Sequence, residues 1–147
     1  MTLPKDPTIA TTEVRELVYQ SRASTDMEPE QLEEILTVAR RKNRQAGLTG
    51  LLLYHEGDFL QVLEGASDQI DEVFGVIRND DRHHRINVVV DRVVPARSFG
   101  EWEMGFYEIH DPLDTAGGVS GFLSGAELPA KVNRYVQMLF ESFRDRR

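Results

Sequence analysis

The sequence contains no cysteine, one tryptophan and no long hydrophobic run in its 147 residues. The lack of cysteine excludes disulfides, thiolate nucleophiles and thiolate metal sites, and it makes a cytoplasmic location the default expectation. No apolar run approaches the roughly 20 residues that a membrane-spanning helix requires. The polar start, residues 1–12, does not resemble a signal peptide. We therefore expect no membrane association.

Positive charge is also scarce, because 17 lysines and arginines stand against 25 aspartates and glutamates, for a net charge of −8. Nucleic-acid binding relies on cations that neutralise phosphates, so it is not expected. The basic cluster from Arg40 to Lys42, with Arg44, closes a predicted helix, where cations interact favourably with the helix dipole. The adjacent His83 and His84 point apart and have no third ligand at a suitable spacing, so no metal site is expected.

Hydrophobic periodicity predicts alternating strands and helices along most of the chain. Strands are predicted over residues 14–21, 50–54, 59–65, 86–94 and 102–109. One helix begins at Pro29 and ends at Gly47, and a second is capped by Ser67 or Asp68. This β-α-β-β-α-β order predicts an α+β, ferredoxin-like fold: a mixed sheet with an extra fifth strand and both helices on one face.

The length and a hydrophobic content of 40% are typical of one globular domain with an appended segment. We expect a flexible tail over residues 1–13 and a folded domain over residues 14–109. Residues 110–147 are expected to form a loose, glycine-rich linker and a last helix that opens at Pro129. That helix is amphipathic, so its apolar side should lie on the open face of the sheet or on a partner chain.

Gln61 is the most informative residue of the predicted strands. Period-two alternation over residues 59–65 predicts a half-buried strand in which Phe59, Gln61 and Leu63 share one face. An amide among apolar side chains needs hydrogen-bond partners, because leaving it unpaired costs about 1–3 kcal/mol. The amide therefore either contributes to core specificity or lies beside a polar ligand.

Two further polar side chains are expected near Gln61. Tyr19 belongs to the strand that runs next to the Gln61 strand in this fold, so its hydroxyl can bond the amide. Asn43 continues the apolar stripe of the first helix. With Ile35 and Ile77 as walls, these residues predict a pocket for a planar polar ligand such as a heteroaromatic ring.

Spaced motifs across the predicted domain carry a family resemblance. In order, they are Leu17-Val18-Tyr19-Gln20-Ser21, Asn43 with Gly47-Leu48-Thr49-Gly50, Phe59-Leu60-Gln61-Val62-Leu63-Glu64-Gly65, Asp80-Asp81-Arg82-His83, and Arg97-Ser98-Phe99 with Trp102-Glu103-Met104. Together they resemble the BLUF domain, a blue-light sensor that binds flavin noncovalently. The resemblance covers about residues 14–109, and Leu48 replaces an isoleucine that is common in the family.

The resemblance implies that a flavin ring lies between the two helices, against Ile35 and Ile77. Gln61 would bond the ring near N5 and the C4 carbonyl, Tyr19 would bond Gln61, and Asn43 would hold the carbonyl edge. The flavin would be FAD, with FMN and riboflavin as alternatives. The other residues implied at the site are Phe59 and Met104, Lys42 near the ring edge or a phosphate, and Asp80, Arg82 and His83 near the ribityl and phosphate portion.

The resemblance also implies a light-driven switch. The excited flavin would take an electron and a proton from Tyr19, the pair would recombine, and Gln61 would be left rotated or tautomerised. A new hydrogen bond to the C4 carbonyl would then shift the absorption to the red. Trp102 and Met104, which the alternation places on one face of the strand 102–109, would relay the change. No effector domain is recognisable after Ile109, so we expect a sensor without enzymatic activity whose output passes to another protein or to a homo-oligomer.

Other interpretations remain open. An acylphosphatase-type hydrolase would need a phosphate-binding loop, for which Arg22 is the only candidate and has no glycine-rich cradle. A flavin reductase would need open access of a substrate to the ring, whereas an inward Tyr19 and Gln61 suit signalling better. A sensor fold that has lost its flavin would serve as an interaction module, and the intact Tyr19, Asn43 and Gln61 argue against it. Taken singly, Tyr19 is an ordinary interior tyrosine, and Arg82 is a loop cation that pairs with Asp80.

Overall fold

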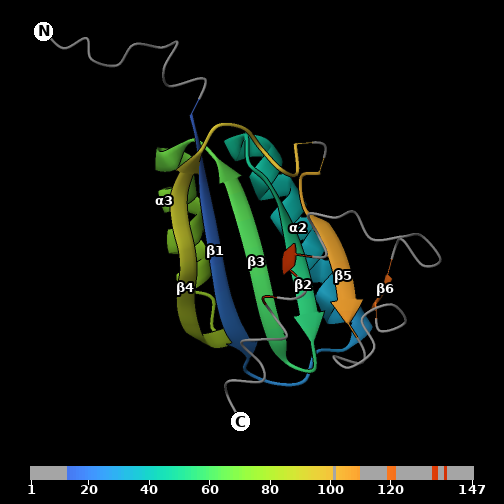
Figure 1. Ribbon diagram of the computed structural model, residues 1–147. Helices are drawn as coiled ribbons and strands as arrows, with labels where there is room; N and C mark the ends of the chain where they lie inside the picture. Colours follow the sequence, from blue (N-terminus) through green and yellow to red (C-terminus); the bar gives the residue numbers. More distant parts are fainter. Residues whose placement is uncertain (1–12, 101, 110–118, 122–133, 136–137, 139–147) are drawn as a thin grey trace, which may run out of the picture.

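A single twisted sheet with two helices makes up the described part of the chain (Figure 1). The computed structural model describes residues 13–100, 102–109, 119–121, 134, 135 and 138. Among these residues, the strands and helices are β1 (Val14–Ala23), α2 (Pro29–Ala46), β2 (Thr49–His55), β3 (Asp58–Gly65), α3 (Ser67–Arg78), β4 (His83–Val94), β5 (Gly105–Ile109) and β6 (Val119–Gly121). The strand order is β4-β1-β3-β2-β5-β6.

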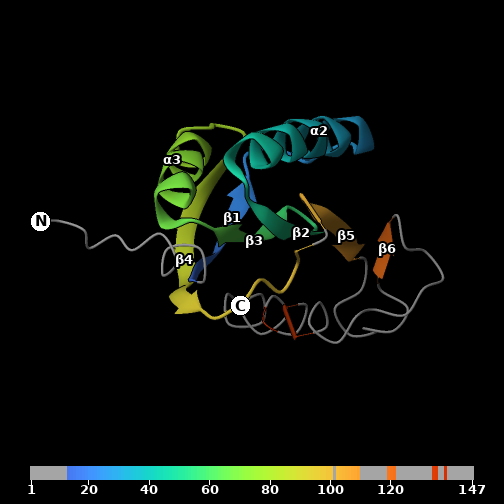
Figure 2. The same ribbon diagram turned by 90° about the horizontal axis from the view of Figure 1, so that it is seen from above.

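The predicted α+β, ferredoxin-like fold is confirmed. Strands β1 and β3 pair antiparallel, β2 and β3 form a hairpin, and β2 and β5 pair parallel, so the sheet is mixed. Helices α2 and α3 lie side by side on one face of it (Figure 2). Within the described residues, neither helix is both long and apolar enough to cross a membrane.

Helix α2 begins and ends at the predicted signals. At its start, Glu28 and Gln31 form a reciprocal capping box around Pro29. At its end, Gly47 has a φ of 70°, a left-handed conformation that favours glycine. The predicted cap of α3 is wrong, because Ala66 is the N-cap and Ser67 is already helical. The Asp68 carboxylate instead accepts the adjacent amide of Gln69 at 3.0 Å.

The predicted start of the fifth strand is wrong. The Trp102 amide donates to the Phe99 carbonyl at 2.9 Å, which closes a turn, and β5 begins only at Gly105. A sixth strand, β6, pairs with β5 within the segment predicted to be a loose linker. Its three residues are too few for an alternating pattern to reveal. Residues 1–12 and most of the predicted last helix lie outside the described residues.

Strand β3 is buried along its whole length, so the half-buried prediction is also wrong. Its Phe59 and Leu63 belong to the core beneath the helices. Its Leu60 and Val62 belong to a second core on the opposite face, which includes Phe99 and Tyr135. The alternation in the sequence therefore separates two cores rather than a core from solvent.

Glu64 fixes the segment that leads from β4 to β5. Its buried carboxylate accepts hydrogen bonds from the Thr49 hydroxyl at 3.0 Å and from the amides of Ser98 and Phe99 at 2.6 and 2.8 Å. Satisfying two backbone donors offsets the desolvation of a carboxylate in the core. Ser98 and Phe99 are therefore anchored to β3 before the chain reaches β5.

Two glycines offer a matched test of this packing. A Cβ on Gly50 would lie 2.0 Å from the Val62 carbonyl oxygen, whereas one on Gly75, inside α3, would meet nothing within 4 Å. We expect Gly50→Ala to lower the free energy of unfolding by about 1–3 kcal/mol through overpacking. Gly75→Ala should raise it by about 0.5–1 kcal/mol through helix propensity. Urea denaturation of both variants measures this, and equal effects would contradict the close approach of β2 and β3.

Candidate functional site

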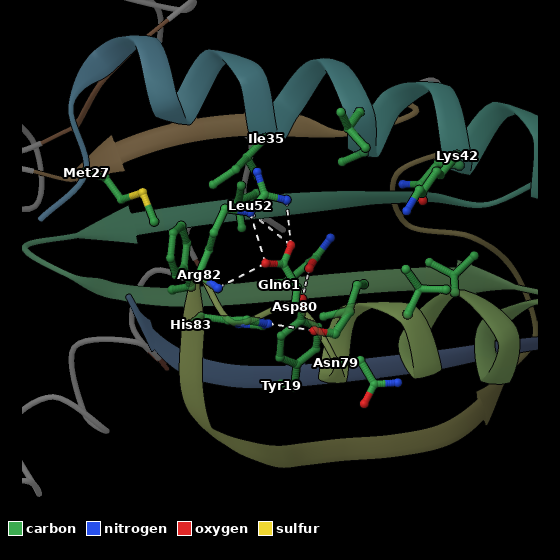
Figure 3. A pocket seen from close by; sticks show the side chains of 17 residues that line it. Tyr19, Met27, Ile35, Lys42, Leu52, Gln61, Asn79, Asp80, Arg82 and His83 are labelled. Atoms are coloured by element: carbon green, nitrogen blue, oxygen red, sulfur yellow. Dashed lines mark hydrogen bonds and ion pairs between the residues drawn. The ribbon is translucent and has the colours of Figure 1, made fainter. Parts of the chain in front are cut away.

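A cavity of about 490 Å³ lies between α2, α3 and the sheet (Figure 3). It is mostly apolar, and it falls within the usual size range of small-molecule sites. The structure brings ten predicted site residues together on its wall, namely Tyr19, Ile35, Lys42, Asn43, Phe59, Gln61, Ile77, Asp80, Arg82 and His83. The wall also contains residues that were not predicted for the site, namely Met27, Val38, Ala39, Leu52, Val73, Val76 and Asn79. Of these, Ala39 and Val73 belong to the apolar stripes of the two helices, so the helical period could have identified them.

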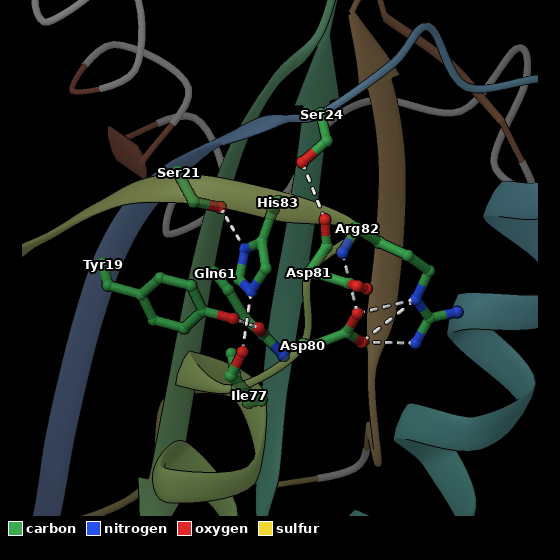
Figure 4. Close-up of polar contacts among 9 residues, drawn as sticks. All are labelled: Tyr19, Ser21, Ser24, Gln61, Ile77, Asp80, Asp81, Arg82 and His83. Atoms are coloured by element: carbon green, nitrogen blue, oxygen red, sulfur yellow. Dashed lines mark hydrogen bonds and ion pairs between the residues drawn. The ribbon is translucent and has the colours of Figure 1, made fainter.

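Tyr19 and Gln61 face each other across the sheet. They are directly paired in the β1–β3 register, and the Tyr19 hydroxyl donates a hydrogen bond to Oε1 of Gln61 (Figure 4). Both side chains are buried, at 3% and 6% exposure. On its other side, the Gln61 amide nitrogen lies 3.8 Å from the Met104 sulfur. The amide thus has a strong partner at its oxygen and a weak one at its nitrogen.

The surroundings of Tyr19 keep its phenol neutral. Burial is the main cause that raises the pKa of Tyr19 far above its usual value of 10.0, and the Asp80 carboxylate adds to the effect. The Phe74 ring, 5.1 Å away between centroids, covers the phenol. Ionisation of Tyr19 therefore plays no part at physiological pH.

His83 joins the end of α3 to β1. Its Nε2 lies 2.8 Å from the Ile77 carbonyl oxygen, and its Nδ1 lies 2.8 Å from the Ser21 hydroxyl (Figure 4). Because a carbonyl oxygen only accepts, Nε2 carries the hydrogen, and in the neutral ring Nδ1 accepts from Ser21. This chain of contacts fixes the wall of the cavity beside Tyr19.

Arg82 and Asp80 form an ion pair at the edge of the cavity. The closest nitrogen and oxygen are 2.5 Å apart, and the Arg82 side chain is 44% exposed. The hydrogen bond from Arg82 is the main cause that lowers the pKa of Asp80. The pairing of Arg82 with Asp80 that the sequence suggested is thus present, and Arg82 also lines the cavity. Within the described residues, no group of three or more potential metal ligands is found.

Trp102 and Met104 lie on opposite faces of the sheet, so the prediction that they share one face is wrong. Both precede β5, where the turn breaks the strand alternation. Met104 belongs to the core beneath the helices. Trp102 packs against the opposite core and stacks on Phe99, with ring centroids 5.7 Å apart and an interplanar angle of 24°.

The lining residues fit a flavin. A flavin ring is planar and carries carbonyl and imide groups along one edge, which the amides of Asn43 and Gln61 can both donate to and accept from. The apolar walls from the two helices suit the faces of the ring. Lys42 and Arg82 place cations on the wall, where a phosphate would be attracted.

Sequence comparison finds relatives across the domain that forms this cavity. The family described as "Sensors of blue-light using FAD" matches residues 14–105. The chain is 33% identical over 93 residues to the blue light- and temperature-regulated antirepressor BluF of Escherichia coli, covering 63% of this chain and 23% of that protein. It is 38% identical over 106 residues to the photoactivated adenylate cyclase subunit alpha of Euglena gracilis, covering 70% of this chain and 10% of that protein. The chain thus spans less than a quarter of these curated relatives.

Solved structures resemble the whole domain. The dark-state structure of BlrB, a BLUF protein, has a TM-score of 0.68 at 28% identity and covers 89% of this chain and 98% of that chain. The photo-activated state of BlsA has a TM-score of 0.64 at 31% identity and covers 70% and 74%. The chain therefore belongs to the BLUF family of blue-light sensors, whose chromophore is the flavin FAD.

Proposed function

We propose that this chain is a blue-light photoreceptor in which Tyr19 and Gln61 are the photoactive pair beside a flavin in the cavity between α2 and α3. The observation that carries the proposal is the buried hydrogen bond from the Tyr19 hydroxyl to the Gln61 amide oxygen on the cavity wall. Bound flavin supplies absorption of blue light and an excited state that accepts an electron.

Tyr19 is the donor in this proposal. Its buried, neutral phenol gives up one electron together with its hydroxyl proton. The first acceptor of that proton is the Gln61 oxygen, which already accepts the hydrogen bond from the Tyr19 hydroxyl. Electron and proton both return to Tyr19, so the cycle has no net redox change. The altered group that remains is the Gln61 amide.

Gln61 is suited to hold two states. Its two ends differ chemically, since one accepts and the other donates hydrogen bonds. Among the described residues its nitrogen has the Met104 sulfur as a weak acceptor, so rotation or tautomerisation of the amide breaks no strong protein contact at that end. The rearranged amide would then donate to the flavin carbonyl and shift the absorption to the red.

The remaining lining residues bind rather than react. We propose that Asn43 holds the carbonyl edge of the ring, that Ile35 and Ile77 contact its faces, and that Lys42 and Arg82 attract the phosphates. His83 and Asp80 hold this end of the site in place through their contacts with Ile77 and Arg82. Phe59 fills the floor beside His83, with ring centroids 6.5 Å apart.

The output is proposed to pass through contact with another protein or a second copy of the chain, in the cytoplasm, without enzymatic activity. The relatives differ in output, since BluF is an antirepressor and others are adenylate cyclase subunits. The hydrolase alternative is disfavoured, because Arg22 is paired with the buried Asp58 at 2.9 Å.

Light-induced absorption changes test the photoactive pair. The flavin-loaded protein should show a small, reversible red shift under blue light. Tyr19→Phe and Gln61→Leu should keep flavin but lose the shift, because one removes the donor and the other the switching amide. Tyr54→Phe is a matched control, since Tyr54 is a buried tyrosine beneath the helices that does not line the cavity. A normal red shift in Tyr19→Phe would contradict the proposal.

Flavin retention tests the role of Asn43. Asn43→Ala should weaken flavin binding about tenfold or more, because a hydrogen bond to the ring is lost in a buried site. Gln45→Ala on the exposed side of α2 is the control and should bind as the parent does. Titration of the apoprotein with FAD measures both, and equal affinities for the two variants would remove Asn43 from the site.

Stability at high pH tests the burial of the Tyr19 phenol. The unfolded phenol ionises above its usual pKa of 10.0, while the folded one stays neutral because its pKa is raised. The unfolded state is therefore favoured as pH rises above 10. Between pH 8 and 11, Tyr19→Phe should lose about 1.4 kcal/mol less unfolding free energy than the parent. Urea denaturation at both values measures this, and parallel losses would mean that the phenol is accessible to water.

A further inference from the structure

Three side chains near the end of α2 bind residues 103 and 104, just before β5. Arg40 Nε donates to the Met104 carbonyl at 3.0 Å, and Asn43 Nδ2 donates to the Glu103 carbonyl at 2.6 Å. Arg44 donates to both carboxylate oxygens of Glu103, at 2.7 and 3.1 Å. We refer to Arg40, Asn43, Arg44 and Glu103 as the α2 latch.

The segment that the α2 latch holds ends at Met104, whose sulfur is the weak hydrogen-bond partner of the Gln61 amide nitrogen. Met104 is buried at 2% exposure, and its sulfur lies 3.8 Å from the Gln61 amide nitrogen. The same segment is fixed to β2, because the Gly50 amide donates to the Trp102 carbonyl at 3.1 Å. The position of the Met104 sulfur against Gln61 therefore depends on contacts made outside the cavity.

The Arg44–Glu103 pair is the part of the latch that can be altered without touching the cavity. Its side chains are 66% and 40% exposed, and neither residue lines the cavity. The bidentate geometry fixes the Glu103 side chain, whose backbone carbonyl Asn43 also holds. From the sequence, the positive charge of Arg44 near the end of α2 was explained by the helix dipole alone. In the structure, Arg44 also forms an ion pair with Glu103.

We propose that Arg40 and Arg44 are positioning residues that hold Met104 against the Gln61 amide and thereby set the lifetime of the light state. This inference rests on the proposed function, in which the Gln61 amide is the switching group. When the latch is released, Met104 moves more freely beside Gln61, so the amide returns more readily to its dark arrangement. Dark recovery should therefore become faster, while flavin remains bound.

Three variants and one control test the latch. Arg44→Gln and Glu103→Gln each remove the ion pair, and the double variant Arg44→Glu with Glu103→Arg restores it with the charges exchanged. Arg41→Gln is the matched control, since Arg41 is an exposed arginine in the same helix turn with the same change of charge. Each flavin-loaded protein is illuminated, and the return of its absorption in darkness is timed.

We expect Arg44→Gln and Glu103→Gln to recover about two- to fivefold faster than the parent, a range typical of losing one exposed but well-formed ion pair. Arg41→Gln and the charge-exchanged double variant should recover within about twofold of the parent. Recovery of both single variants at the rate of Arg41→Gln would overturn the inference. So would a double variant no slower than the single ones.

Hydrogen exchange in darkness gives a readout that does not depend on light. In the apoprotein, amide exchange at Gly50 and residues 103–106 should be faster in Arg44→Gln than in Arg41→Gln, because the segment is less restrained. A parent without a red shift would overturn the proposed function and this inference with it. A normal red shift with equal recovery and equal exchange in the two variants would overturn the inference alone.

Discussion

The hydrogen bond between Tyr19 and Gln61 is the contact on which the rest of the site depends. It exists because β1 and β3 pair in a register that sets the two residues opposite each other. A slip of one residue would turn Gln61 to the other face of the sheet. The β2–β3 hairpin fixes the same strand from its other side, with Leu52 opposite Gln61. The pairing of β3 with β1 and β2 thus places the polar Gln61 amide beside a mostly apolar cavity.

The second core lies directly behind the strand that carries Gln61. Because β3 is covered on both faces, its inward residues meet the cavity while its outward residues meet Phe99 and Tyr135. The Tyr135 hydroxyl donates to the buried Glu16 carboxylate at 2.5 Å, which ties a residue far along the sequence to β1. Because close-packed interiors transmit strain, we expect a rearrangement at Gln61 to displace its neighbours in β3 and in this second core.

The sequence was sufficient for the fold and for the convergence of the site, and it failed where tertiary contacts override local pattern. Periodicity and caps placed α2, because both are short-range signals. The order of strands and helices identified a split βαβ sheet, in which the strand of Tyr19 lies beside the strand of Gln61. Alternation over residues 102–109 misplaced Trp102, because a turn joins Phe99 to Trp102 and residues 102–104 lie outside β5. The alternation in β3 suggested solvent on one side, because nothing local reveals which segment covers the second face. The contacts of Arg40 and Arg44 likewise depend on residues some sixty positions away, which no local pattern reports.

The most direct test of the account is a light-minus-dark infrared difference spectrum of the flavin-loaded protein, recorded with and without isotopically labelled glutamine side chains. If Gln61 is the group that stays altered, label-sensitive amide bands should appear under light, decay with the flavin red shift and be absent from Gln61→Leu. A reversible red shift without any band that moves with the glutamine label would contradict the account. The light state would then be stored elsewhere in the molecule.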